Sequence, residues 1–184
     1  MGSQLPVMLV DGYNVIGAWK ELSVIRDTDS LDRARNALTE KMINYSAVER
    51  YDATLVFDAY NQGNLAVTET VSPFLKLHYT EQGQTADAYI EKRCREYARD
   101  PLRHRRRLVV VTSDRVQGLL AGGFGAELRS ASAFVSDVQA VLAKLKGQTQ
   151  SERGGRIGGT LDRCSKIKPS DRQRLQRMRL GLDT

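Results

Sequence analysis

Leu9–Val10–Asp11–Gly12–Tyr13–Asn14–Val15–Ile16, close to the amino terminus, joins an apolar run to a cluster of polar residues. The run from Val7 to Val10 predicts a strand buried on both faces, and it ends at the carboxylate of Asp11. Gly12 predicts a sharp turn of the backbone at that point, and Asn14 adds an amide beside the acid. The stretch therefore predicts a buried strand that delivers polar side chains at its carboxyl end.

The same strand ending occurs twice more. Thr54–Phe57 leads into Asp58, and Leu108–Ser113 leads into Asp114. In open parallel sheets, ligands bind just beyond the carboxyl ends of the strands. Three strands that each end in Asp would therefore bring three carboxylates to one edge of the sheet.

Amphipathic segments separate these strands and predict helices. Apolar residues recur at helical spacing from Leu31 to Tyr45 and again from Ala86 to Tyr97. Thr85 is a candidate N-cap for the second helix, whose first turn contains Asp87. We predict an irregular segment at 59–72 and a further strand at Phe74–Tyr79. This alternation predicts an α/β fold with a mostly parallel central sheet.

We expect one α/β domain over residues 1–147 and a basic C-terminal tail over 148–184. A final helix extends to Leu145 in this interpretation, and the glycines of 154–159 predict a break after it. Pro169–Asp171 is a candidate cap for a terminal helix within the tail.

The charge of the chain is uneven. The 184 residues carry a net charge of +6, and residues 151–184 hold nine Lys/Arg against four Asp/Glu, a net +5. A second basic cluster, Arg103–Arg107, precedes the third strand. Such clusters suit a phosphate backbone, although either one alone is equally consistent with a solvated surface. The sequence shows neither a membrane-spanning apolar run nor a secretory signal, so we expect an intracellular protein without a membrane partner.

Five acids form the candidate site: Asp11, Asp58, Asp87, Asp114 and Glu91. Clustered carboxylates repel one another, so they take up protons or bind a cation. Oxygen ligands without a Cys or His pattern favour Mg²⁺ or Mn²⁺ over zinc. The simpler interpretation of any one of these acids is a helix cap or turn residue.

A divalent cation in a basic protein suits phosphodiester hydrolysis. His78 and His104 are the only histidines, which argues against a ribonuclease mechanism based on a nucleophilic histidine. The sequence contains neither the P-loop motif nor a Gly-x-Gly-x-x-Gly motif after the first strand, and it lacks the Gly-x-Ser-x-Gly motif of α/β-hydrolases.

Four segments together resemble the YacP-like branch of the NYN-domain family, relatives of the PIN nucleases. They are MLVDGYNVIGAW (8–19), LVFDAY (55–60), QTADAYIEK (84–92) and VVVTSD (109–114), within a similarity covering about residues 7–147. The resemblance implies a PIN-like three-layer α/β/α sandwich with an acidic Mg²⁺ site and endoribonuclease activity. In the bacterial branch it implies cleavage of mRNA on the translating ribosome. It implies a cytoplasmic location, or the plastid stroma if the source is a photosynthetic eukaryote.

The resemblance also implies roles for individual residues. Asp11, Asp87 and Asp114 would hold the metal ion, with Asp58 as the acid of the second strand. Asn14 would orient the site, and Glu91 would lie beside it. Thr112 and Ser113 would place a hydroxyl or backbone N–H near a phosphate, and we assign Arg105, Arg106 and Arg107 to RNA binding. The chain departs from the expected pattern at Tyr60, where we expect His in close relatives.

Two other functions remain open. A nuclease fold that binds RNA or the ribosome without cleaving it would share the fold and the basic tail. A phosphoacceptor domain of the response-regulator type also places acids at strand ends. It requires two adjacent acids after the first strand and a Lys after the last, and neither feature is present.

Overall fold

The structure, a computed structural model, describes residues 4–58 and 65–164, with side chains as far as residue 148. The chain divides into two units, Met1–Leu142 and Ala143–Thr184, and the fold described below is that of the first unit. Tyr60 and the candidate cap at Pro169–Asp171 lie outside the described residues.

Six strands form one sheet in the order β3-β4-β2-β1-β5-β6. The strands are β1 Val7–Asp11, β2 Asp52–Phe57, β3 Val67–Ser72, β4 Leu75–Tyr79, β5 Leu108–Val111 and β6 Glu127–Arg129. Every neighbouring pair is parallel except β3 and β4. The mostly parallel sheet predicted from the sequence is therefore confirmed.

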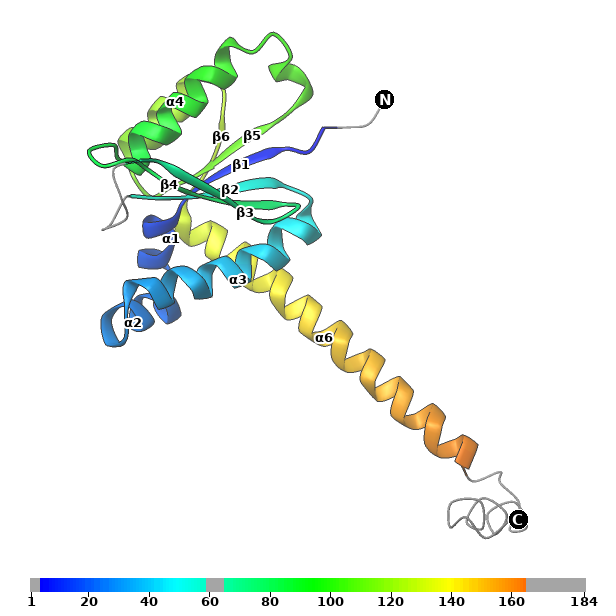
Figure 1. The fold of residues 1–184 in the computed structure, drawn as a ribbon. Coiled ribbons are helices and arrows are strands. Elements are labelled where there is room, and N and C mark those ends of the chain that lie inside the picture. Colours follow the sequence, from blue (N-terminus) through cyan, green and yellow to red (C-terminus); the bar gives the residue numbers. More distant parts are fainter. Residues whose placement is uncertain (1–3, 59–64, 165–184) are drawn as a thin grey trace, which may run out of the picture. The chain divides into compact units, whose positions relative to one another are not determined.

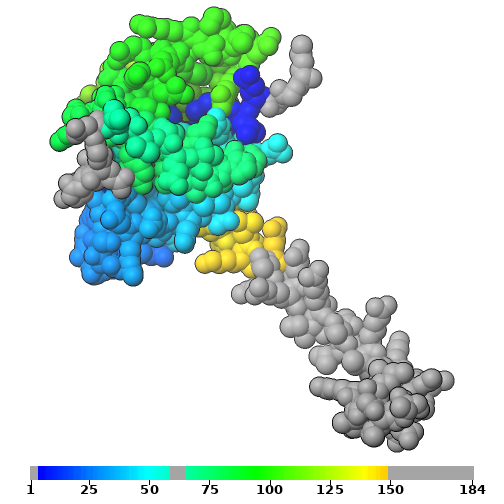
Figure 2. Space-filling view, viewed as in Figure 1, coloured from blue at the N-terminus to red at the C-terminus, as the bar shows by residue number. Residues whose placement is uncertain are grey.

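The helices are α1 Gly12–Ala18, α2 Lys20–Thr28, α3 Leu31–Glu49, α4 Ala86–Arg99, α5 Arg115–Gly123 and α6 Ala131–Cys164, with a 3₁₀ turn at Arg103–Arg105. Helices α1, α2 and α3 cover one face of the sheet, and α4 covers the other (Figure 1). In the face shown in Figure 2, the green residues of the α4 side and the blue residues of α1–α3 likewise lie on opposite sides of the sheet. This is the predicted three-layer α/β/α sandwich.

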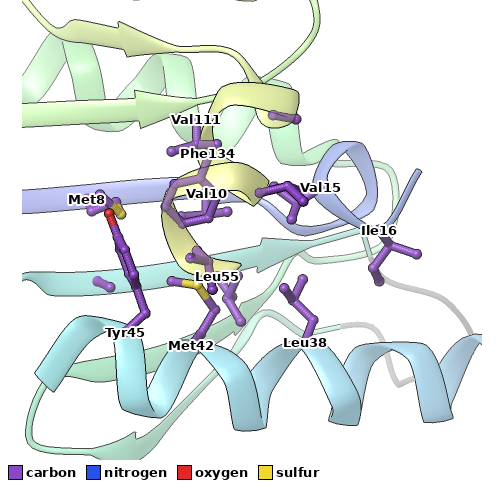
Figure 3. Close-up of a cluster of buried hydrophobic side chains, with 14 of the residues drawn as sticks. Met8, Val10, Val15, Ile16, Leu38, Met42, Tyr45, Leu55, Val111 and Phe134 are labelled. Atoms are coloured by element: carbon purple, nitrogen blue, oxygen red, sulfur yellow. The ribbon is translucent and has the colours of Figure 1, made fainter. Parts of the chain in front are cut away.

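Alternating side chains of the central strands fill two separate cores. Met8 and Val10 of β1 point to the α3 side, whereas Leu9 points to the α4 side. Figure 3 shows Leu38, Met42 and Tyr45 of α3 packed toward β1 and β2, together with Phe134 of α6. On the other face, Ile90 and Cys94 of α4 pack against the sheet. Because β1 is buried from both sides, its carboxyl end is held firmly in place.

The connections place a crevice beside β1. From β1 the chain proceeds to β2 and β4 on one side, and it returns through α4 to β5 on the other side. Such a reversal of strand order is where open α/β sheets bind their ligands, at the carboxyl ends of the strands. Asp11 and Asp114 follow the two strands that flank this point.

Two sequence-based expectations are wrong in detail. Residues 67–72 form the edge strand β3, paired antiparallel with β4, rather than an irregular segment. Helix α6 continues through residues 154–159, where the glycines predicted a break. Gly12 lies where the chain passes directly from β1 into α1, at the turn that the sequence predicts, although its backbone is not left-handed. It is required for another reason, because a Cβ there would lie 2.1 Å from the Phe57 ring.

No helix in residues 4–58 and 65–164 combines the length and apolar character that crossing a membrane requires.

Candidate active site

Asp11 lies at the carboxyl end of β1 and caps α1. Its Oδ1 accepts a hydrogen bond from the Asn14 backbone N–H at 3.0 Å, and its Oδ2 accepts one from Asn14 Nδ2. Asp11 is only 4% exposed. Burial raises the pKa of Asp11, the hydrogen bonds from Asn14 lower it, and the nearby charge of Asp58 raises it further. Because Asn14 fixes the buried Asp11 carboxylate with two hydrogen bonds, this carboxylate is well placed to bind a cation.

Asn14 connects the ends of two strands. While its Nδ2 donates to Asp11, its Oδ1 accepts a hydrogen bond from the backbone N–H of Ser113, beyond β5, at 3.3 Å. Asn14 therefore fixes the position of Asp11 relative to the β5 end of the crevice. The family resemblance implies that Asn14 orients the site, and these contacts are compatible with that role.

Asp114 directly precedes α5, and its carboxylate caps that helix. Asp114 Oδ1 accepts from the backbone N–H groups of Val116 at 2.7 Å and Gln117 at 3.1 Å. The Thr112 hydroxyl accepts from the Asp114 backbone N–H at 3.0 Å, which shapes the turn before the helix. Ser113 donates its N–H to Asn14, so this N–H already has a partner within the protein, whereas the buried Thr112 hydroxyl accepts from Asp114 and keeps its own O–H as a donor.

Asp58 and Asp87 meet at the start of α4. The Asp58 carboxylate accepts a hydrogen bond from the backbone N–H of Ala86, the first residue of the helix. Thr85 caps the same helix by accepting from the Ala88 N–H, as the sequence predicts. Asp87 Oδ1 accepts a hydrogen bond from Gln117 Nε2 of α5 at 2.6 Å. The first turn of α4 thus brings Asp87 toward the acids of the strand ends.

The charges of these acids act on one another. Burial raises the pKa of Asp87, and the negative charges of Asp11, Asp114 and Asp58 raise it further. Three carboxylates from three different strand ends therefore lie close enough to Asp87 to disfavour its ionised form. The four aspartates form one electronegative region at the carboxyl edge of the sheet.

Among the described residues, no group of three or more His, Cys, Asp or Glu side chains is arranged closely enough to hold a metal ion. The donor set nevertheless suits Mg²⁺ or Mn²⁺, since it consists of carboxylate and amide oxygens. Asp11 and Asp114 cap helices and Asp58 accepts from the first N–H of α4, as the simpler interpretation predicts. Asp87 instead accepts from the side chain of Gln117 in another helix. A carboxylate offers about four lone-pair sites, so one or two accepted hydrogen bonds leave capacity for a cation.

Glu91 lies one turn after Asp87 and forms an ion pair with Arg95 at 2.6 Å. It lines a cleft of about 260 Å³ between α4 and α5, together with Asp87 and Asp114. The cleft walls include the apolar residues Ile90 and Leu120. Glu91 therefore lies beside Asp87 and Asp114, and its carboxylate is paired with the guanidinium group of Arg95 in the same helix.

The structure does not bring the three arginines to the acids. Arg105, Arg106 and Arg107 precede β5, so they lie at its amino end, whereas the acids lie at the carboxyl ends. The four residues of β5 span about 13 Å between these edges. Arg106 bonds to Asp52 and to the Leu5 carbonyl, and Arg107 pairs with Glu127. Two of these guanidinium groups thus contribute to ion pairs at the opposite edge.

Gln117 is the site residue that sequence reasoning misses. Its side chain bonds Asp87 and its backbone bonds Asp114, so it links two acids from different elements. A single Gln in a short helix carries no sequence signal for such a role. Only the packing of α4 against α5 reveals it.

Comparisons with known proteins agree with this architecture. A family model described as the YacP-like NYN domain matches residues 8–180. The chain is 30% identical over 142 residues to the uncharacterized protein YacP of Bacillus subtilis (strain 168). This alignment covers 77% of this chain and 80% of that protein.

The fold is also similar to solved structures. The crystal structure of Rae1 (YacP) from Bacillus subtilis matches with a TM-score of 0.68 and 24% identity, over 96% of each chain, and supports the fold alone. A point mutant of the same protein matches with a TM-score of 0.65 and 28% identity, over 80% of this chain and 82% of the other.

Proposed function

The chain belongs to the YacP-like NYN domain family of PIN-like nucleases, and we propose that it is a metal-dependent endoribonuclease. The observation that carries this proposal is the placement of Asp11, Asp58 and Asp114 at the carboxyl edge of the sheet, beside the first turn of α4, where their charges raise the pKa of Asp87. Such mutual repulsion is typical of sites that bind a divalent cation and is costly without one.

Asp11, Asp87 and Asp114 would hold Mg²⁺ or Mn²⁺, with Asp58 as the fourth carboxylate. A divalent cation supplies Lewis acidity for the attacking water and for the scissile phosphate. Fixed hydrogen bonds would hold these carboxylates in position for the cation, above all those that Asn14 donates to Asp11 and that Asp114 accepts at the start of α5. The cleft between α4 and α5, which apolar Ile90 and Leu120 line together with Asp87 and Asp114, lies beside these carboxylates and would be open to a substrate phosphate.

The histidines support a mechanism without imidazole catalysis. His78 is buried and stacks on the Tyr89 ring with centroids 3.7 Å apart, and its Nδ1 shares a hydrogen bond with the Thr68 hydroxyl. Burial lowers the pKa of His78, and the charges of Arg93 and Lys92 lower it further. His104 lies in the 3₁₀ turn before β5, at the edge opposite the acids. Acid–base work therefore falls to the carboxylates and to water.

For the substrate we propose mRNA on the translating ribosome, in the cytoplasm or the plastid stroma, on the strength of the family resemblance. The basic residues of 151–184 would supply attraction to a phosphate backbone. The alternative is an inactive RNA- or ribosome-binding module with the same fold. Cleavage of RNA distinguishes the two functions, because the enzyme cuts phosphodiester bonds and the binding module does not.

The decisive experiment compares cleavage by the parent, Asp11→Asn and Asp27→Asn. Asn caps a helix as well as Asp does, so Asp11→Asn removes the charge while retaining the start of α1. Asp27 is exposed and pairs only with its neighbour Arg26, which makes it a matched control. We expect cleavage of an mRNA with Mg²⁺ or Mn²⁺, loss of cleavage with a chelator, and a loss of at least about a hundredfold in Asp11→Asn alone.

The same assay run with and without ribosomes tests the proposed substrate. Cleavage that requires translation supports the ribosomal substrate, whereas equal cleavage of free RNA restricts the proposal to an endoribonuclease. If Asp11→Asn cleaves at the parental rate, the metal mechanism is wrong. If the parent binds RNA without cleaving it under any metal condition, the binding-module function replaces the enzyme.

A further inference from the structure

Gln117 is a buried amide with an unusual set of contacts. The residue is 6% exposed, and its Nε2 donates to Asp87 Oδ1 at 2.6 Å. Because a carboxylate accepts but does not donate, the nitrogen of the amide must face Asp87 and the oxygen must face away. That Oε1 is buried and has no hydrogen-bond partner among the described residues.

The unpaired oxygen argues against a purely structural role. A buried acceptor without a partner costs at least as much as one ordinary hydrogen bond contributes. Helices α4 and α5 are already joined by the apolar contacts of Ile90 and Ala121 in the core on that side of the sheet. A Gln at this position therefore adds little to stability, and an apolar residue of the same length would fill the space without an unpaired oxygen.

We infer that Gln117 is a positioning residue that holds Asp87 in the geometry required for cation binding. Its backbone N–H donates to Asp114 Oδ1 at 3.1 Å, while its side chain fixes Asp87 Oδ1. One residue thereby sets the separation of two carboxylates that come from different elements and repel each other. Because Gln117 donates to Oδ1, Asp87 Oδ2 would be the oxygen that binds the cation.

This inference rests on the proposed function, because it assigns Gln117 to the same metal site. Residues that orient metal ligands from outside the coordination sphere change metal affinity by about 10- to 100-fold when they are replaced. The inference therefore makes a prediction about Mn²⁺ affinity that is independent of RNA cleavage.

The test uses the full chain with Gln117→Met, which keeps the length of the side chain and removes both polar groups. Gln117→Leu is a second variant, and Gln139→Leu is the control, since it makes a similar change at an exposed position of α6. Mn²⁺ affinity is measured by electron paramagnetic resonance, and thermal unfolding is measured with a chelator present. RNA cleavage gives kcat and KM separately.

We expect both Gln117 variants to bind Mn²⁺ about 10- to 100-fold more weakly than the parent. Their unfolding temperatures should equal or exceed the parental value, and kcat should fall while KM for RNA is unchanged. Gln139→Leu should match the parent in Mn²⁺ affinity.

Parental Mn²⁺ affinity in the variants overturns the inference and leaves the proposed function intact. A large fall in unfolding temperature in both variants also overturns it, because Gln117 is then structural. A parent that binds no Mn²⁺ refutes the metal-dependent function itself, so the two failures are distinguishable.

Discussion

The pKa of Asp87 is raised by the negative charges of three other aspartates. Burial and the charges of Asp11, Asp114 and Asp58 all raise its pKa above the ordinary value of 3.8. The folded protein therefore binds a proton on Asp87 more tightly than the unfolded chain does. In the pH range above 3.8 the folded state holds more protons, so the free energy of unfolding falls as pH rises through that range.

Asp87→Asn should remove this penalty. Its Oδ1 can still accept from Gln117, and the repulsion by three carboxylates disappears. With a chelator present, we expect the variant to unfold slightly above the parent at pH 7, because solvent screens the charges around the partly exposed Asp87, and at the parental temperature below about pH 4. Thermal unfolding followed by circular dichroism across this pH range measures the difference. A difference that does not depend on pH would show that charge repulsion is not its cause.

Residue 12 must be a glycine because the neighbouring Phe57 ring leaves no room for a Cβ atom. An added Cβ would lie 2.1 Å from Phe57 Cε1, and the Phe57 ring is fully buried against Tyr13 and Tyr79. We expect Gly12→Ala to cost about 1–3 kcal/mol, because the ring has no free space to enter. The unfolding temperature should fall by about 3–10 °C.

Gly17 provides the matched control for this prediction. It lies in the same helix, and a Cβ there would meet nothing within 4 Å. Gly17→Ala should leave the unfolding temperature unchanged or raise it, because Ala favours the helix. Equal destabilisation by both substitutions would contradict the proposed close contact.

The positions of the acids at one edge of the sheet could be predicted from the sequence, whereas the residues that hydrogen-bond to them could not. Asp11 and Asp114 follow apolar runs, and strand direction alone brings them to one edge. The same rule applied to Arg106 would have placed it at the opposite edge, because it precedes β5. Gln117 was not predictable, since its importance arises from a contact with a residue 30 positions away.

At the scale of secondary-structure elements, the first turn of α4 links stability to the site. Thr85 Oγ1 accepts from the Ala88 N–H at 3.2 Å, and Asp87 lies between these two residues. Thr85→Ala should cost about 1 kcal/mol and loosen this turn. Mn²⁺ affinity, measured by titration, should therefore fall several-fold, because Asp87 is the carboxylate that the turn carries.

Ser30→Ala is the control for the effect of losing a cap. Ser30 caps α3 by accepting from the Arg33 N–H, also at 3.2 Å. It should lower stability by a similar amount and leave Mn²⁺ affinity unchanged. If both cap variants weaken Mn²⁺ binding equally, general destabilisation rather than the position of Asp87 explains the loss.

The predictability of the elements follows their burial. The strands β1, β2 and β5 are recognisable because burial on both faces demands continuous apolar runs. Strand β3 is an edge strand with exposed residues from Val67 to Thr70, so its sequence resembles a polar loop. Its pairing with β4 comes from tertiary structure rather than from a local pattern.

At the scale of the whole chain, the positive charge and the acidic edge occupy different parts of the sequence. The described arginines include several that are already paired with carboxylates, among them Arg26, Arg33, Arg93 and Arg107. Residues 151–184, by contrast, carry nine basic residues against four acidic ones. We therefore expect this segment to supply much of the electrostatic attraction to RNA.

Replacing four of its arginines by Gln should reduce the salt dependence of RNA binding. Each phosphate contact on a single strand contributes about 0.7 to the slope of log K against log salt, so the slope should fall by up to about 3. Fluorescence anisotropy with a labelled single-stranded RNA, at several salt concentrations, measures this slope. The substituted residues are Arg172, Arg174, Arg177 and Arg179.

The matched control removes the same number of positive charges from the four paired arginines named above. Because those guanidinium groups already have carboxylate partners, their loss should change the slope much less. Mn²⁺ affinity should be unchanged in the control variant, since the carboxylate partners of its four arginines are not among the four aspartates of the site. Equal flattening of the slope in both variants would show that net charge, rather than residues 151–184, governs RNA binding.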